Sequence, residues 1–100
     1  MKDVRITVMK KVCHDDLIQK YENPIDNPCS MEAGQTFISK NGLCPDGLCI
    51  SAWESMSAFV MALAYGAKDI YDGWMKNPNS VMISCNDGFR PVSFLIETIG

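Results

Sequence analysis

Residues 81–96, VMISCNDGFRPVSFLI, decide the fold class of this 100-residue chain. Core-forming residues recur at every second position in 81–85 and again in 92–96, which is the period-two pattern of strands with one buried face. Between these runs, Asn86-Asp87-Gly88 supplies the residue types that favour a turn. The segment therefore predicts a C-terminal β-hairpin.

The rest of the chain predicts further strands and a short helix around this hairpin. Alternating β-branched residues predict a strand within 2–12, and Thr36-Phe37-Ile38-Ser39 predicts a second, short strand. Apolar residues that follow His14-Asp15-Asp16 at helical spacing predict a short helix, which Asn23-Pro24 ends. Residues 69–75 could form one or two more helical turns.

The main helix is expected over residues 51–65. Ser51 and Glu54 have the spacing of a capping box, in which each side chain satisfies a backbone donor at the helix start. A broad apolar face follows, and Gly66 is a suitable terminator. The expected architecture is α+β, with a small, mostly antiparallel sheet and its C-terminal hairpin packed on this helix, in one domain over residues 1–100.

Composition excludes several classes of function. The chain is 47% hydrophobic and carries a net charge of −3, so it offers no basic surface for nucleic acid. No apolar run approaches the roughly 20 residues that span a bilayer, and the first residues alternate where a signal peptide would be continuously apolar. We therefore expect a cytoplasmic protein without nucleic-acid or membrane partners. A small core favours self-association, so a homo-oligomer is compatible with the sequence.

Cysteine is the residue type that carries the most chemical information here. The five cysteines are Cys13, Cys29, Cys44, Cys49 and Cys85. In a reducing compartment they would be free thiols, metal ligands or redox groups rather than structural disulfides. Cys49 precedes the expected main helix, whose partial positive charge would stabilise a thiolate. The alternative is that Cys49 is a small buried residue under the helix start.

Three of these cysteines are expected at the ends of structural elements. Cys29 falls in a loop, Cys49 before a helix and Cys85 at the end of a hairpin strand, and such ends can converge at one rim of a small domain. Three thiolates could hold zinc, copper(I) or iron, because soft sulfur ligands favour these metals. The alternative is three unrelated buried thiols.

Three further residues are candidates for contact with a ligand. Asp87 could bond backbone amides in the hairpin turn, and Arg90 could pair with a carboxylate or an anionic ligand. Trp53 could line a pocket with other aromatic and methionine side chains, although helical spacing also suits a core position. No nucleotide-binding glycine pattern, serine nucleophile elbow or paired-histidine motif is present, so no common enzyme class is favoured.

The arrangement of motifs resembles a small uncharacterised family of prokaryotic proteins of about a hundred residues. The resemblance rests on the Cys-containing proline loop at 28–29, on Pro45-x-Gly-x-Cys-x-x-Ala-Trp53 and on Cys85-x-Asp-Gly-x-Arg-Pro-Val92. It runs along nearly the whole chain. One departure is that the family has a Cys-Pro loop, whereas here Pro28 precedes Cys29 and Ser30 follows it. The resemblance singles out Cys29 and the cysteines of the other two motifs, and it implies no particular activity.

The sequence thus leads to one main hypothesis and two rivals. The main hypothesis is a cytoplasmic protein in which Cys29, Cys49 and Cys85 bind a soft metal or undergo reversible thiol oxidation, with Cys49 as the principal sulfur. A rival is a non-catalytic homo-oligomeric module that binds a ligand or assembles through aromatic and methionine side chains. The last is an enzyme that clamps a small anionic substrate with Arg90 and attacks it with a cysteine.

Overall fold

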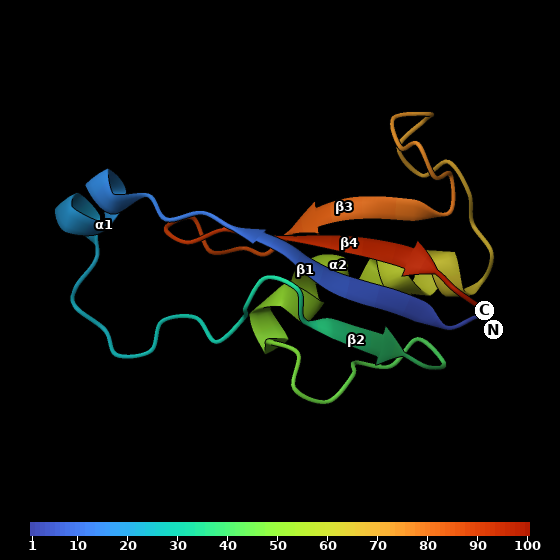
Figure 1. Cartoon of the computed structure of the whole chain (residues 1–100), viewed down its shortest axis with the longest axis horizontal. Helices are drawn as coiled ribbons and strands as arrows, with labels where there is room; N and C mark the ends of the chain where they lie inside the picture. The colour runs from blue at the N-terminus through green and yellow to red at the C-terminus, as the bar shows by residue number, and fades with distance from the viewer.

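The fold is built from four strands and two helices. A computed structural model describes residues 1–100. In chain order the elements are β1 (Val4–Lys11), α1 (Asp15–Tyr21), β2 (Thr36–Ser39), α2 (Ile50–Ala64), β3 (Ser80–Ser84) and β4 (Val92–Thr98). The strands form one antiparallel sheet in the order β2-β1-β4-β3 (Figure 1). The predicted α+β class, the strands and the C-terminal hairpin are therefore confirmed.

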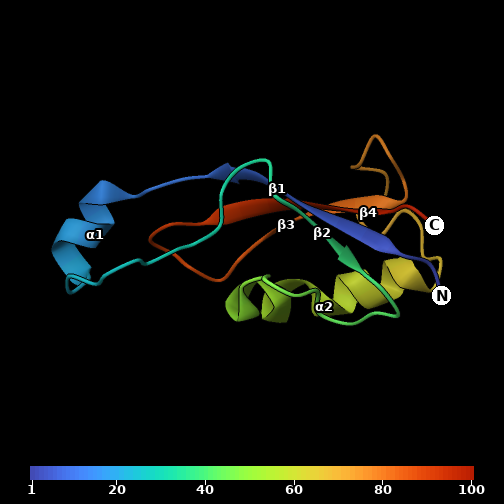
Figure 2. The ribbon, with the colours of Figure 1, turned by 60° about the horizontal axis from the view of Figure 1, so that its bottom comes forward.

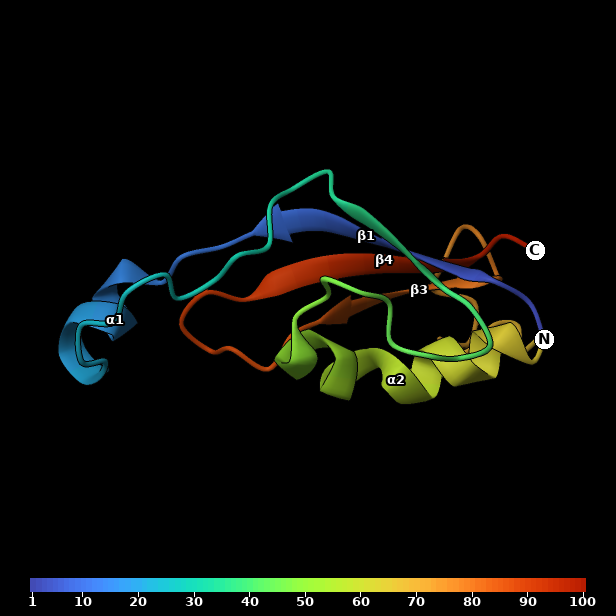
Figure 3. The ribbon, with the colours of Figure 1, turned by 90° about the horizontal axis from the view of Figure 1, so that it is seen from below.

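The core lies between one face of the sheet and α2. Alternate residues of β1, β3 and β4 point to this face, and the helix contributes its own apolar side. Figures 2 and 3 show α2 lying along one face of the sheet. Phe94, at the centre of β4, is completely buried, and so is Met56 of α2. The opposite face of the sheet has no helix over it and leaves Met82 and Ile38 partly exposed.

The main helix starts earlier than the capping box predicts. It begins at Ile50 with Cys49 as its N-cap residue, and no side chain caps its first turn. Ser51 is already inside the helix, so the prediction that Ser51 and Glu54 form a capping box is wrong. The predicted terminator is confirmed, because Gly66 follows the last turn with φ +92°, a conformation that glycine adopts without steric cost.

The two segments predicted as short helices have different outcomes. Helix α1 forms as expected but buries none of its residues and lies beyond the end of the sheet (Figure 1). Residues 69–75 form turns instead of a helix, because Asp69 and Asp72 have φ values of 53° and 50°, outside the right-handed helical region. Neither α1 nor α2 has the length and apolar character needed to cross a membrane.

An irregularity in the ladder shapes the end of the sheet next to α1. The register between β1 and β4 shifts between Val8 and Lys10, which leaves Met9 as an extra residue in β1. Pairing continues beyond both strands, since the Val12 N–H donates to the Pro91 carbonyl at 3.0 Å and the His14 N–H donates to the Phe89 carbonyl at 2.9 Å. The chain that leaves β1 is thus held beside the β3–β4 loop.

The burial of side chains predicts that the sheet face packed against α2 contributes most to the free energy of unfolding. Replacement of the buried Phe94 by alanine (Phe94→Ala) should lower the free energy of unfolding by about 3–5 kcal/mol, because it leaves a large cavity in the core. Met82→Ala, on the open face of the neighbouring strand, is the control and should cost less than about 1 kcal/mol. Urea denaturation measures both values, and equal costs would contradict the assigned core.

Candidate functional site

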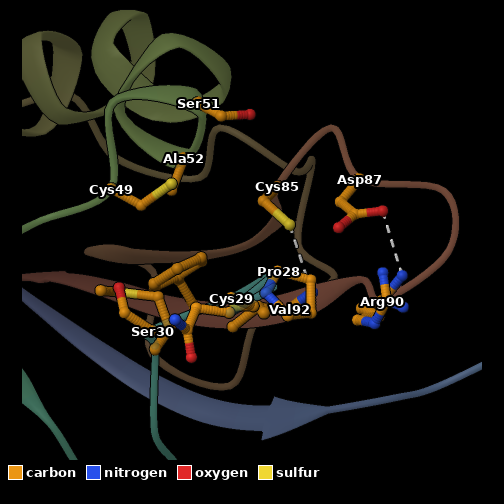
Figure 4. A pocket seen from close by; sticks show the side chains of 13 residues that line it. Pro28, Cys29, Ser30, Cys49, Ser51, Ala52, Cys85, Asp87, Arg90 and Val92 are labelled. Carbon is orange, nitrogen blue, oxygen red and sulfur yellow. Dashed lines mark hydrogen bonds between the residues drawn. The ribbon is translucent and has the colours of Figure 1, made fainter. Parts of the chain in front are cut away.

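A pocket of about 220 Å³ opens where three parts of the fold meet. They are the start of α2, the hairpin loop between β3 and β4, and the loop that connects α1 to β2. Each part contributes one cysteine to the lining, namely Cys49, Cys85 and Cys29 (Figure 4). The structure therefore brings to one pocket the three cysteines that sequence reasoning singled out, although they are far apart in the chain.

Cys49 is the most accessible of the three sulfurs. Its side chain is exposed, whereas those of Cys29 and Cys85 are half-buried. As the N-cap residue it accepts the first helical hydrogen bond, from the Trp53 N–H to its carbonyl at 3.0 Å. The N–H groups before Trp53 have no partner inside the helix. Since Ser51 and Ala52 line the pocket, the partly positive helix start borders it.

Cys85 is held firmly by the hairpin. Its backbone N–H donates to the Val92 carbonyl at 3.0 Å, and its Sγ accepts a hydrogen bond from the Val92 N–H at 3.3 Å (Figure 4). The backbone N–H and the carbonyl of Val92 thus both bond to Cys85, and these two bonds end the β3–β4 ladder at the start of the loop. The position of this sulfur follows directly from the pairing of β3 with β4.

Cys29 reaches the pocket from a segment without regular structure. The loop between α1 and β2 places Asn27, Pro28 and Ser30 around the pocket together with Cys29. The next residue, Met31, is only 3% exposed and belongs to the core. Burial of Met31 therefore anchors the loop just after its cysteine.

Asp87 and Arg90 line the same pocket, and both have partners within the chain. The Asp87 carboxylate accepts hydrogen bonds from the backbone N–H groups of Phe89 at 2.8 Å and Arg90 at 3.1 Å, which is the turn role predicted for it. The Arg90 guanidinium donates to both carboxylate oxygens of Glu22, at 3.1 and 2.7 Å. These hydrogen bonds raise the pKa of Arg90, a side chain that is charged at every physiological pH in any case. An anionic ligand would have to compete with Glu22 for this side chain.

Trp53 and the two remaining cysteines lie away from the pocket. Trp53 is half-buried and packs against the core, so it does not line the pocket. Cys44 also packs against the core, and burial raises the pKa of its thiol. Cys13 is exposed, and its thiol donates to the Asp15 carboxylate at 3.2 Å. That hydrogen bond is the main reason why the pKa of Cys13 is raised.

All five cysteines are free thiols in this structure. No group of three or more His, Cys, Asp or Glu side chains lies close enough together to hold a metal ion in the arrangement described. The pocket thus collects three soft sulfur donors around one space without forming a closed coordination shell. This arrangement leaves the thiols available to a molecule that enters the pocket.

Sequence reasoning missed two residues of the site. Glu22 pairs with Arg90 from 68 positions away, and no local pattern indicates such a partner. The sequence spacing assigns Ser51 to a helix cap, whereas the structure places it on the pocket. The spacing of Ser51 and Glu54 correctly indicates that a helix begins near this point. It carries no information about which part of the fold the first helical turn faces.

Comparison with protein-family models, with curated proteins and with solved structures finds no match for this chain. The resemblance to the prokaryotic family therefore stays a prediction. What can be said of function depends on the pocket itself, on its three thiols and on the charged residues beside it.

The contact between Cys13 and Asp15 predicts a change in thiol reactivity with pH. Asp15→Asn removes the carboxylate that raises the pKa of Cys13, so the thiolate should form at lower pH and the alkylation of Cys13 at pH 8 should accelerate several-fold. Alkylation rates between pH 7 and 10, resolved for each cysteine by mass spectrometry, measure the change. Asp16→Asn is the control and should leave the profile in place. An unchanged profile in Asp15→Asn would contradict the assigned hydrogen bond.

Proposed function

We propose that the protein performs thiol chemistry in this pocket, with Cys29, Cys49 and Cys85 acting as one site and Cys49 as the principal sulfur. The observation that carries the proposal is that three free cysteines from separate segments line one pocket. The two remaining cysteines, Cys13 and Cys44, lie elsewhere and have raised thiol pKa values, which disfavours their thiolates.

The favoured chemistry is reversible oxidation of the pocket thiols. Two thiols lose two electrons and two protons to form a disulfide, and an incoming peroxide or low-molecular-weight disulfide accepts the electrons. An organic hydroperoxide gives the protein disulfide, an alcohol and water, and hydrogen peroxide gives the disulfide and two waters. A cellular thiol would restore the reduced state by exchange, as expected in a cytoplasmic setting.

Access and position suggest separate roles for the three sulfurs. Cys49 is exposed at the start of α2, so it is the sulfur that an incoming oxidant meets first. Cys85 is fixed by the hairpin and Cys29 lies on an irregular loop. We assign the attacking role to Cys49 and the resolving role to one of its two neighbours.

Binding of a soft metal ion is the second form of the same proposal. Zinc, copper(I) or iron would suit three sulfur donors. The carboxylates of Glu22 and Asp87 outnumber the single guanidinium of Arg90, so the fixed charges beside the pocket favour a cation over an anion. A closed shell of three sulfurs would require the segments that carry them to move closer together, because no three ligands are close enough in this arrangement.

A homo-oligomeric assembly module is a second candidate function. The face of the sheet opposite α2 leaves Met9, Ile38 and Met82 between 38% and 46% exposed, with no helix over them. Trp74, on the turn segment before β3, is 83% exposed. This reading predicts a dimer or larger assembly that does not depend on any cysteine, which analytical ultracentrifugation of the wild type and a Cys49→Ser variant would detect.

The test of the thiol site compares Cys49→Ser with Cys44→Ser. Wild-type protein, purified without oxygen and without a histidine tag, is assayed for bound metal and for the rate at which its thiols react with peroxide. Loss of the exposed pocket sulfur in Cys49→Ser should lower the rate constant of the fastest phase of the reaction with peroxide at least about tenfold. If the site instead binds a metal, the variant should lose the stoichiometric metal. Cys44→Ser, which changes a half-buried thiol outside the pocket, should retain wild-type behaviour.

One result would contradict the proposed thiol function. If Cys49→Ser and wild type have the same metal content and the same fast thiol phase, Cys49 is not the principal sulfur. The assembly module would then become the leading candidate.

A further inference from the structure

The loop that carries Cys29 is attached to the molecule mainly at its two ends. We call residues 23–30, between the end of α1 and the buried Met31, the strap. None of the backbone N–H or carbonyl groups of the strap bonds to another backbone group. Segments that lack such bonds and bury little apolar surface open at low free-energy cost. The position of Cys29 over the pocket therefore depends on what fixes the two ends of the strap.

One end is fixed by core packing and the other by an ion pair. Met31 is 3% exposed and secures the end next to Cys29. At the other end, Glu22 follows α1 and accepts two hydrogen bonds from Arg90, which belongs to the β3–β4 loop. The two side chains are only 14% and 18% exposed, so solvent and salt screen this pair less than a surface pair.

Packing contributes little to holding α1 in place, because this helix buries none of its residues fully and only Ile18 is half-buried. Upstream of it, the chain is tied to the β3–β4 loop by backbone hydrogen bonds from Val12 and His14. Downstream of it, the Glu22–Arg90 pair is the charged contact to the same loop. Loss of this pair would free the strap from its α1 end up to Met31.

We propose that the Glu22–Arg90 pair is a latch that keeps the strap closed over the pocket. Glu22 and Arg90 are thus positioning residues, which act on the chemistry through Cys29. The latch sets both the place of Cys29 beside the other two sulfurs and the ease with which a molecule enters the pocket. This inference deepens the proposed function, since it states how the third sulfur of that site is positioned and exposed.

The test measures the access of alkylating reagent to each cysteine in the native protein. Glu22→Gln keeps the shape of the side chain and removes its charge, so the strap should open more often and Cys29 should be alkylated about tenfold faster than in the wild type. Iodoacetamide labelling, resolved for each cysteine by mass spectrometry, gives the rates. Cys44, outside the pocket, serves as the internal reference.

Glu97→Gln is the matched control variant. It breaks the other charged pair of the structure with hydrogen bonds from an arginine, in which Arg5 donates to Glu97 at 3.0 and 2.9 Å across the sheet. It should leave the ratio of Cys29 to Cys44 labelling unchanged. Arg90→Gln should accelerate Cys29 as Glu22→Gln does, and the double variant should add little more, because both changes open the same contact.

Three results would overturn the latch. They are an unchanged rate at Cys29 in Glu22→Gln, an equal acceleration of all five cysteines, and full additivity of Glu22→Gln with Arg90→Gln. Labelling reports access to the thiols and requires neither oxidation nor metal binding. Failure of the latch is therefore distinguishable from failure of the thiol function, which the metal content and peroxide reactivity of Cys49→Ser decide.

Discussion

The antiparallel ladder between β1 and β4 is the constraint on which the rest of the structure depends. It joins the two ends of the chain, from the pair Val4–Thr98 to the pair Lys11–Val92. β2 then pairs with the outer side of β1, and β3 with the outer side of β4. Because side chains alternate across a strand, the register of this one pair decides which residues meet α2 in the core. A slip of β1 by one residue against β4 would turn Ile6 away from the helix, while Phe94 would still face it.

The same ladder also builds the candidate site. Its continuation past β1 holds the chain at Val12 and His14 beside the β3–β4 loop, and this brings Glu22 within reach of Arg90. The packing of α2 on the sheet then sets Cys49 at the same end of the molecule as Cys85. Two sulfurs are thus placed by rigid elements, whereas Cys29 is placed by a strap held at its ends. This difference suits a site in which one thiol must move to reach another.

The sequence predicted the elements that depend on local pattern. Alternation in residues 81–96 predicted the hairpin, the patterns in residues 2–12 and 36–39 predicted the other two strands, and a broad apolar face predicted α2. The expected positions of Cys29, Cys49 and Cys85 at the ends of elements match the lining of the pocket. The helix expected over residues 69–75 does not form, because Asp69 and Asp72 adopt left-handed backbone angles. The spacing of residues in the sequence does not reveal such angles. The Glu22–Arg90 pair was beyond prediction, since it depends on where two irregular segments meet after the sheet has formed. Local patterns therefore indicated where in the fold Cys29, Cys49 and Cys85 lie, but not the contacts that position them.

The most direct test of the central claim is to map disulfides after oxidation of the reduced protein with one equivalent of hydrogen peroxide. Proteolysis and mass spectrometry then identify the linked cysteines. If Cys29, Cys49 and Cys85 form one thiol site, the main product is an intramolecular disulfide between two of these three, with Cys13 and Cys44 still reduced. Oxidation confined to Cys13 or Cys44, or oxidation of the pocket thiols without any bond between them, would contradict the account.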